Sequence, residues 1–122
     1  MGIGGVRMQD RFRYRVWDKT QNKWLHFDFS TYPTYQDRIW QALADGETFY
    51  QCTGLKDKNG KLIYEGDVIS ENWHKYVLEW GRGDFQLRDF AKGSVYTFPA
   101  GICIEKCEII GNIYENKELL ED

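Results

Sequence analysis

From residue 11 onward, apolar and basic side chains alternate with a period of two. One set of alternate positions is apolar and the other is mostly basic, with Phe12, Tyr14 and Val16 in the first and Arg11, Arg13, Arg15 and Trp17 in the second. Because successive side chains of a strand point to opposite faces, this pattern predicts a half-buried strand whose arginines face solvent. A polar, turn-like stretch follows, and residues 23–27 predict a second strand.

The pattern then changes from strand to helix and back to strand. Ile39, Trp40 and Leu43 fall at helical spacing and Asp45-Gly46 follows as a stop signal, so we expect a short helix over residues 35–44. Beyond it the apolar runs are short and β-prone, with turn residues between them, at 47–52, 75–80, 85–90, 95–98, 102–104, 107–110 and 112–114. Short strands at such intervals predict a small barrel.

Two reversals of the chain are expected within residues 51–69. Asn59-Gly60 lies between two lysines, and both residues tolerate the positive φ that a type I′ hairpin turn requires. Glu65-Gly66-Asp67 interrupts the next β-prone run and predicts a tight turn or a bulge. The glycines lack the Gly-Lys-Ser/Thr ending of a phosphate-binding loop. We therefore assign a structural role in turns to Asn59, Gly60, Gly66 and Asp67.

Three segments of the chain together resemble the YopX family of phage and prophage proteins. They are residues 53–69, 12–25 and 109–120, which include Thr-Gly-Leu-Lys-Asp-Lys-Asn-Gly-Lys, Phe-Arg-Tyr-Arg-Val-Trp-Asp and Ile-Ile-Gly-Asn-Ile-Tyr-Glu. The resemblance implies a β-rich protein, encoded by a phage or prophage, with an SH3-like barrel in its later part. It implies no particular activity.

Pattern and resemblance lead to one expectation for the fold. We expect a mainly β chain with a small SH3-like β-barrel in its later part, an N-terminal β-hairpin or strand segment, and at most one or two short helices. The expected division is residues 1–50 for the N-terminal β segment with its helix, and residues 51–122 for the barrel-type domain.

Charge and composition limit the classes of partner. The net charge of the 122 residues is −3, so a basic surface over the whole molecule is excluded. Residues 1–24 carry six basic side chains against two acidic ones, whereas residues 105–122 carry two against six, which favours pairing within the chain or between subunits. No apolar run approaches the ~18 residues of a membrane span. With three cysteines, an odd number, we expect a protein of the bacterial cytoplasm with free thiols.

Groups suited to catalysis or metal binding are sparse. Only His26 and His74 titrate near neutral pH without perturbation. Cys52, Cys103 and Cys107 with His74 lack the paired spacing of a zinc site, so we expect no metal and no cofactor. An enzyme centred on His74 with Glu65 or Asp67 is the least favoured hypothesis.

Two further hypotheses concern binding. The favoured one is a non-catalytic interaction module that contacts a phage or host protein, or assembles with itself, through an aromatic surface with Trp73, Trp80 and Tyr96 as candidates. The alternative is a nucleic-acid-associated protein that uses Arg11, Arg13 and Arg15 with Lys19 and Lys23, and with Trp17 stacking beside them. Core packing is the competing explanation for the aromatic residues, and a solvated strand face is the competing explanation for the arginines.

Overall fold

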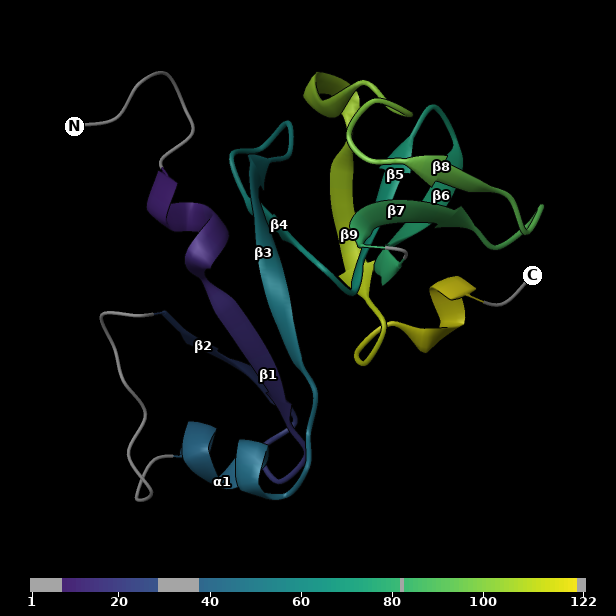
Figure 1. Ribbon diagram of the computed structural model, residues 1–122. Helices are drawn as coiled ribbons and strands as arrows, with labels where there is room; N and C mark the ends of the chain where they lie inside the picture. Colours follow the sequence, from purple (N-terminus) through teal and green to yellow (C-terminus); the bar gives the residue numbers. More distant parts are fainter. Residues whose placement is uncertain (1–7, 29–37, 82, 121–122) are drawn as a thin grey trace.

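The computed structural model describes residues 8–28, 38–81 and 83–120 and shows two antiparallel β-sheets packed side by side (Figure 1). The described chain also holds one α-helix, α1 (Arg38–Ala44), and three 3-10 helices: η1 (Met8–Phe12), η2 (Ile104–Lys106) and η3 (Lys117–Leu120). The prediction of a mainly β protein with few and short helices is confirmed. The predicted helix over 35–44 is seen from Arg38, since residues 35–37 lie outside the described part.

The first sheet has the strand order β2-β1-β3-β4. Its strands are β1 (Tyr14–Asp18), β2 (Lys23–Phe27), β3 (Phe49–Lys56) and β4 (Leu62–Tyr64). β1 and β2 form a regular hairpin in which Tyr14 pairs with Phe27 and Asp18 with Lys23, so the strand predicted at 23–27 is confirmed. The boundary expected between residues 50 and 51 falls inside β3, and the proposed division into domains stays a prediction.

The second sheet has the order β8-β7-β6-β5-β9 and curves into a half-barrel. Its strands are β5 (Asp67–Glu71), β6 (His74–Gly81), β7 (Asp84–Asp89), β8 (Val95–Thr97) and β9 (Glu108–Asn112). The strand predicted at 102–104 is wrong, because the chain turns there toward η2, and of the strand predicted at 112–114 only Asn112 is found in a strand, as the last residue of β9.

The core lies on the concave side of the half-barrel. Its members are apolar side chains from four strands and the connections between them: Ile63, Ile69, Tyr76, Leu78, Leu87, Phe98 and Cys107. Ile63 comes from β4 of the first sheet, so this cluster also joins the two sheets. Removal of this apolar surface from water is the main force that holds the half-barrel together.

The turn between β3 and β4 differs from the predicted type I′ turn. Only Gly60 has a positive φ, of 82°, whereas Asn59 does not. The Asp57 carboxylate accepts hydrogen bonds from the backbone N–H groups of Asn59 and Lys61, both at 2.9 Å, and Gly60 N donates to Asp57 O at 3.0 Å. These bonds favour a turn that is followed by one left-handed residue, Gly60, over the type I′ geometry.

The first predicted strand is shorter and more buried than its alternation indicates. Arg11 and Phe12 belong to η1, and β1 starts at Tyr14. Within β1 both faces are covered, so Arg15 and Trp17 are buried. The turn that follows β9 covers Trp17, since the ring of Tyr114 stacks on Trp17 with centroids 5.0 Å apart.

Candidate functional site

Trp73, at the tip of the β5–β6 hairpin, is the most exposed large apolar side chain of the described residues, at 99%. Its backbone has a φ of 72°, and that of Asn72 is 48°, so both turn residues are left-handed. This conformation suits Asn or Gly and is a true outlier for a bulky residue, at a cost of about 1–2 kcal/mol. A tryptophan therefore stands where glycine would be the ordinary choice.

Beside Trp73 lies a cavity of about 220 Å³, which we call the Trp73 groove. Its apolar lining comes from the convex side of the half-barrel, from the end of β7 and from η3: Val68, Val77, Phe90, Leu119 and Leu120. Val68 and Val77 are cross-strand partners and both are buried. The groove thus offers an apolar floor next to an exposed indole ring.

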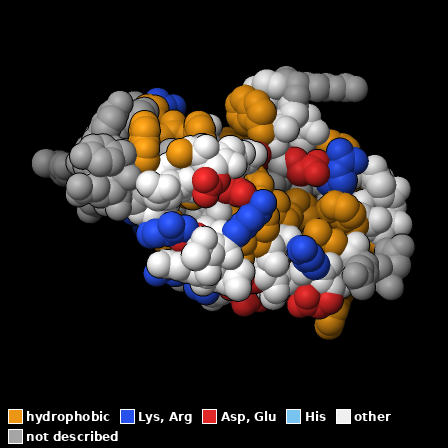
Figure 2. All heavy atoms as spheres, turned by 90° about the horizontal axis from the view of Figure 1, so that it is seen from below, with side chains coloured by type: hydrophobic (Ala, Val, Ile, Leu, Met, Phe, Trp, Pro, Cys, Tyr) orange, Lys and Arg blue, Asp and Glu red, His pale blue; other side chains and the backbone are white. Residues whose placement is uncertain are grey.

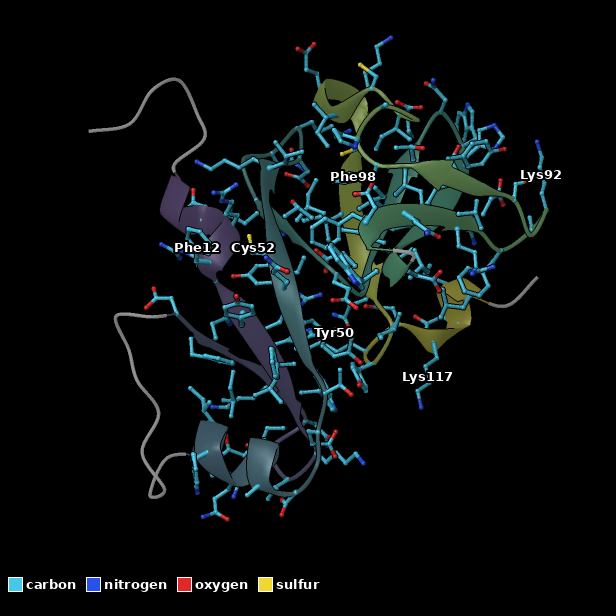
Figure 3. All side chains as sticks on the ribbon, viewed as in Figure 1. Phe12, Tyr50, Cys52, Lys92, Phe98 and Lys117 are labelled. Atoms are coloured by element: carbon cyan, nitrogen blue, oxygen red, sulfur yellow. The ribbon has the colours of Figure 1, made fainter. Side chains whose placement is uncertain are left out.

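Positive charge borders this groove. Lys75 and Lys92 line it and are exposed, and no ion pair among the described residues includes either of them. Lys92 extends into solvent from the loop that follows β7 (Figure 3). The buried Asp89 carboxylate accepts hydrogen bonds from Ala91 N and Lys92 N and lies 3.9 Å from His74 Nδ1. Asp89 therefore serves the turn, and the two ammonium groups are free to meet a partner.

Trp80 and Tyr96, the other aromatic candidates, are not part of this groove. Trp80 is 52% exposed and packs edge-to-face on Phe85, and Tyr96 is 38% exposed and contacts Tyr76 in the same way. Each of these two rings is therefore partly packed against another aromatic ring and partly exposed to solvent. Seen from below, hydrophobic side chains also reach the surface near the middle of that face, between basic and acidic ones (Figure 2). Apolar exposure alone is thus a weak guide to a site, and the strained backbone sets Trp73 apart.

Arg15 is unavailable to an external anion, which corrects the prediction that it faces solvent. Its Nη2 atom donates to Asp67 Oδ1 at 2.7 Å and to Glu65 O at 3.1 Å, and its guanidinium lies between the rings of Trp24 and Tyr64. Burial raises the pKa of Asp67, and the positive charge of Arg15 opposes that rise. The pair joins β1 to the start of β5.

Three of the four remaining basic candidates of this region, Arg11, Arg13 and Lys19, are also engaged within the chain, whereas Lys23 is exposed and no ion pair among the described residues includes it. Arg13 pairs with Asp10 at 3.4 Å and Lys19 with Glu47 at 2.8 Å. Arg11 lies over the ring of Phe12, and the predicted stacking residue Trp17 is buried. The structure therefore does not assemble these side chains into one free basic strip.

The predicted catalytic cluster does not come together. His74 lies at the far end of β5 from Asp67, opposite Glu71, and the Asp67 carboxylate is occupied by Arg15 and by Tyr64 N at 2.8 Å. The Glu65 backbone N–H donates to the carbonyl oxygen of Gln51. Burial raises the pKa of the Glu65 carboxyl group.

The cysteines do not gather into a metal site. Among residues 8–28, 38–81 and 83–120, no three His, Cys, Asp or Glu side chains are close enough together to hold a metal ion. Cys52 and Cys107 are buried, and burial raises the pKa of Cys107 to about 11, which disfavours its thiolate. No helix of the described chain has the length and apolar character needed to cross a membrane.

Sequence reasoning identified Trp73 but missed the groove beside it. Phe90 was placed in a strand, and Leu119 and Leu120 carried no functional expectation. The available signal was the pair of adjacent leucines within the acidic segment 105–122, an unusual place for two large apolar side chains.

Comparison with known proteins shows two solved structures with this fold. The crystal structure of protein EF1440 from Enterococcus faecalis is 24% identical, with 89% of this chain and 97% of that one covered and a TM-score of 0.56. The crystal structure of protein yopX from Bacillus subtilis is 19% identical, with 91% and 99% covered and a TM-score of 0.50. These likenesses show the fold alone. No curated protein gives a significant match.

The matched segment of the sequence covers nearly all of the described structure. The family described as YopX protein matches residues 13–121, which include both sheets, the β5–β6 hairpin and the leucines of the Trp73 groove. On this evidence the chain belongs to the YopX family.

Proposed function

We propose that this protein is a non-catalytic interaction module that binds another protein through Trp73 and the groove beside it. The observation that carries the proposal is the fully exposed tryptophan held in a left-handed backbone conformation. Backbone strain of this kind persists at sites of function, because folding alone selects against it.

The chemistry of tryptophan supports a protein as the partner. Its large ring has an apolar body and one N–H donor, and such residues contribute most of the binding energy of many protein interfaces. An adjacent apolar groove gives the partner a place for a side chain of its own. In keeping with the family resemblance, the proposal places the protein in a phage- or prophage-bearing bacterium, in the cytoplasm and without a cofactor.

Site-specific photo-crosslinking tests this proposal in cells. A benzoylphenylalanine at position 90, which lines the groove, is partly exposed and leaves Trp73 in place, is expected to give a discrete crosslinked product with one protein, identified by mass spectrometry. The same group at position 80 is the matched control, because Trp80 is also exposed yet lies outside the groove. Equal products from both positions, or none from position 90, would contradict the proposal.

A further inference from the structure

We infer that the groove selects an acidic partner segment with adjacent large aliphatic side chains, whose carboxylates pair with Lys75 and Lys92. This inference rests on the proposed function and specifies the chemistry of the partner. The cavity of about 220 Å³ is lined by valine and leucine side chains and bordered by both lysines. The same site would therefore recognise both the apolar side chains and the negative charge of a partner.

The apolar half of the inference follows from the floor and wall of the groove. Val68 and Val77 form the buried floor, and Leu119 and Leu120 of η3 form part of the lining while still half-exposed. An occupant of the groove therefore meets an apolar surface built from valine and leucine side chains, which suits large aliphatic side chains of its own. A partner that supplies a further pair would cover the exposed parts of these leucines and gain the free energy of apolar burial.

The acidic half follows from the charges that face the groove. Its lining includes the two lysines, His74 and Asp89. Asp89 is buried and bonded to two backbone N–H groups, whereas both ammonium groups are exposed and lack an ion-pair partner among the described residues. A carboxylate that reaches the border of the groove therefore meets attraction from both lysines, and a lysine or arginine there meets repulsion.

A peptide with the sequence of residues 117–122, Lys-Glu-Leu-Leu-Glu-Asp, has this chemistry and serves as the probe. With both termini blocked, it would be titrated into the full-length protein while the indole N–H resonance of Trp73 is followed by NMR, assigned with Trp73→Phe. The matched control is the amide peptide Lys-Gln-Leu-Leu-Gln-Asn. We expect the acidic peptide to shift the Trp73 resonance in a saturable way and the amide peptide to bind more weakly.

Variants of the protein separate the contribution of the two lysine charges to peptide affinity from the contribution of the apolar contacts. Each exposed ion pair contributes little to binding. The double variant Lys75→Gln with Lys92→Gln is therefore expected to reduce the affinity for the acidic peptide by about three- to tenfold and to leave the affinity for the amide peptide unchanged. The matched control, Lys56→Gln with Lys106→Gln, removes two exposed lysines outside the groove and is expected to change neither affinity. Added salt should reduce the advantage of the acidic peptide.

The outcomes distinguish this inference from the proposed function. No response to the acidic peptide, or equal affinity for both peptides, overturns the acidic preference. Crosslinking from position 90 would still stand in either case as evidence for protein binding. Should the protein prove dimeric by light scattering and the peptide dissociate it, the occupant of the groove is a second copy, and the assignment to a separate partner is overturned.

Discussion

One turn precedes strand β5 and another follows it. Both turns contain residues with a left-handed backbone, but the first is buried and the second is exposed to solvent. At the start of β5, Gly66 has a φ of 91° and is enclosed by protein. Its N–H donates to Leu78 O at 2.8 Å and its C=O accepts from Ile113 N at 3.0 Å. At its end, Asn72 and Trp73 adopt the same region of φ in full contact with solvent.

The difference shows where the fold explains a conformation and where it does not. A Cβ atom at position 66 would lie 3.6 Å from Ile113 Cδ1 and 3.7 Å from Arg15 Nη2, which are ordinary van der Waals distances, so glycine is favoured there for its positive φ. At position 73 nothing in the described structure packs on the indole to offset its strained backbone. Glycine at the first turn therefore serves folding, whereas the fold gives no reason for the tryptophan at the second, which we propose serves binding.

The largest expected effect comes from the first turn. Arg15→Ala leaves the buried Asp67 carboxylate with Tyr64 N as its remaining hydrogen-bond donor, and we expect a loss of about 3–5 kcal/mol in the free energy of unfolding at pH 7. Urea denaturation measures it. Arg88→Ala is the matched control, because Arg88 pairs with Glu79 at 2.8 Å while both side chains are partly exposed, and its loss is expected to change stability by about 0–1 kcal/mol. A small effect at Arg15 would show that the pair does not join the two sheets.

Acid should relieve part of that loss. Burial already raises the pKa of Asp67, and without Arg15 the pKa in the folded state rises further above the unfolded value. A raised carboxyl pKa in the folded state gives stability at low pH that is lost as the pH rises through it. The difference between wild type and Arg15→Ala is thus expected to shrink between pH 7 and about pH 4. A constant difference across this range would exclude Asp67 as its cause.

Gly66→Ala is expected to have an intermediate effect. The fold would hold the alanine at a φ of 91°, which a residue with a Cβ atom disfavours, at a cost of about 1–2 kcal/mol. Gly83→Ala is a useful comparison, since it has a φ of 79° but no atom within 4 Å of an added Cβ. Because both glycines share a positive φ and neither added Cβ would clash, thermal unfolding should show similar losses for the two variants, and a much larger loss at Gly66 would contradict backbone strain as the cause.

The smallest effect should have the opposite sign. Trp73→Gly relieves a left-handed tryptophan, and after the entropy of glycine is counted we expect about 0.5–1 kcal/mol of stabilisation. Asn72→Gly is the matched variant at the neighbouring position, where Asn already tolerates this conformation and little should change. Destabilisation by Trp73→Gly would mean that the indole supports the fold.

Local patterns in the sequence were enough for much of this fold. The second strand, the helix and the short later strands follow from periodicity and turn residues that lie close together in the chain. Arg15 was beyond such reasoning, because alternation assigns a side chain to a face but does not show what covers that face. Here Asp67, more than fifty residues later, meets the guanidinium.

Two hairpin turns also have conformations that the turn residues alone do not predict. Asn59-Gly60 has the residues of a type I′ turn, but the Asp57 carboxylate bonds to the turn N–H groups and selects another geometry. Asn72-Trp73 lacks glycine and still takes positive φ at both positions. Trp73 was a candidate for its aromatic ring alone, whereas its strain and its groove depend on contacts that only the structure provides.

The most direct test of the central claim is the affinity of the partner crosslinked at position 90 for Trp73→Gly protein, compared with wild type. Our account predicts that this variant folds at least as stably as wild type and loses the partner. Retention of the partner with unchanged affinity would contradict the claim that the strained tryptophan is there to bind.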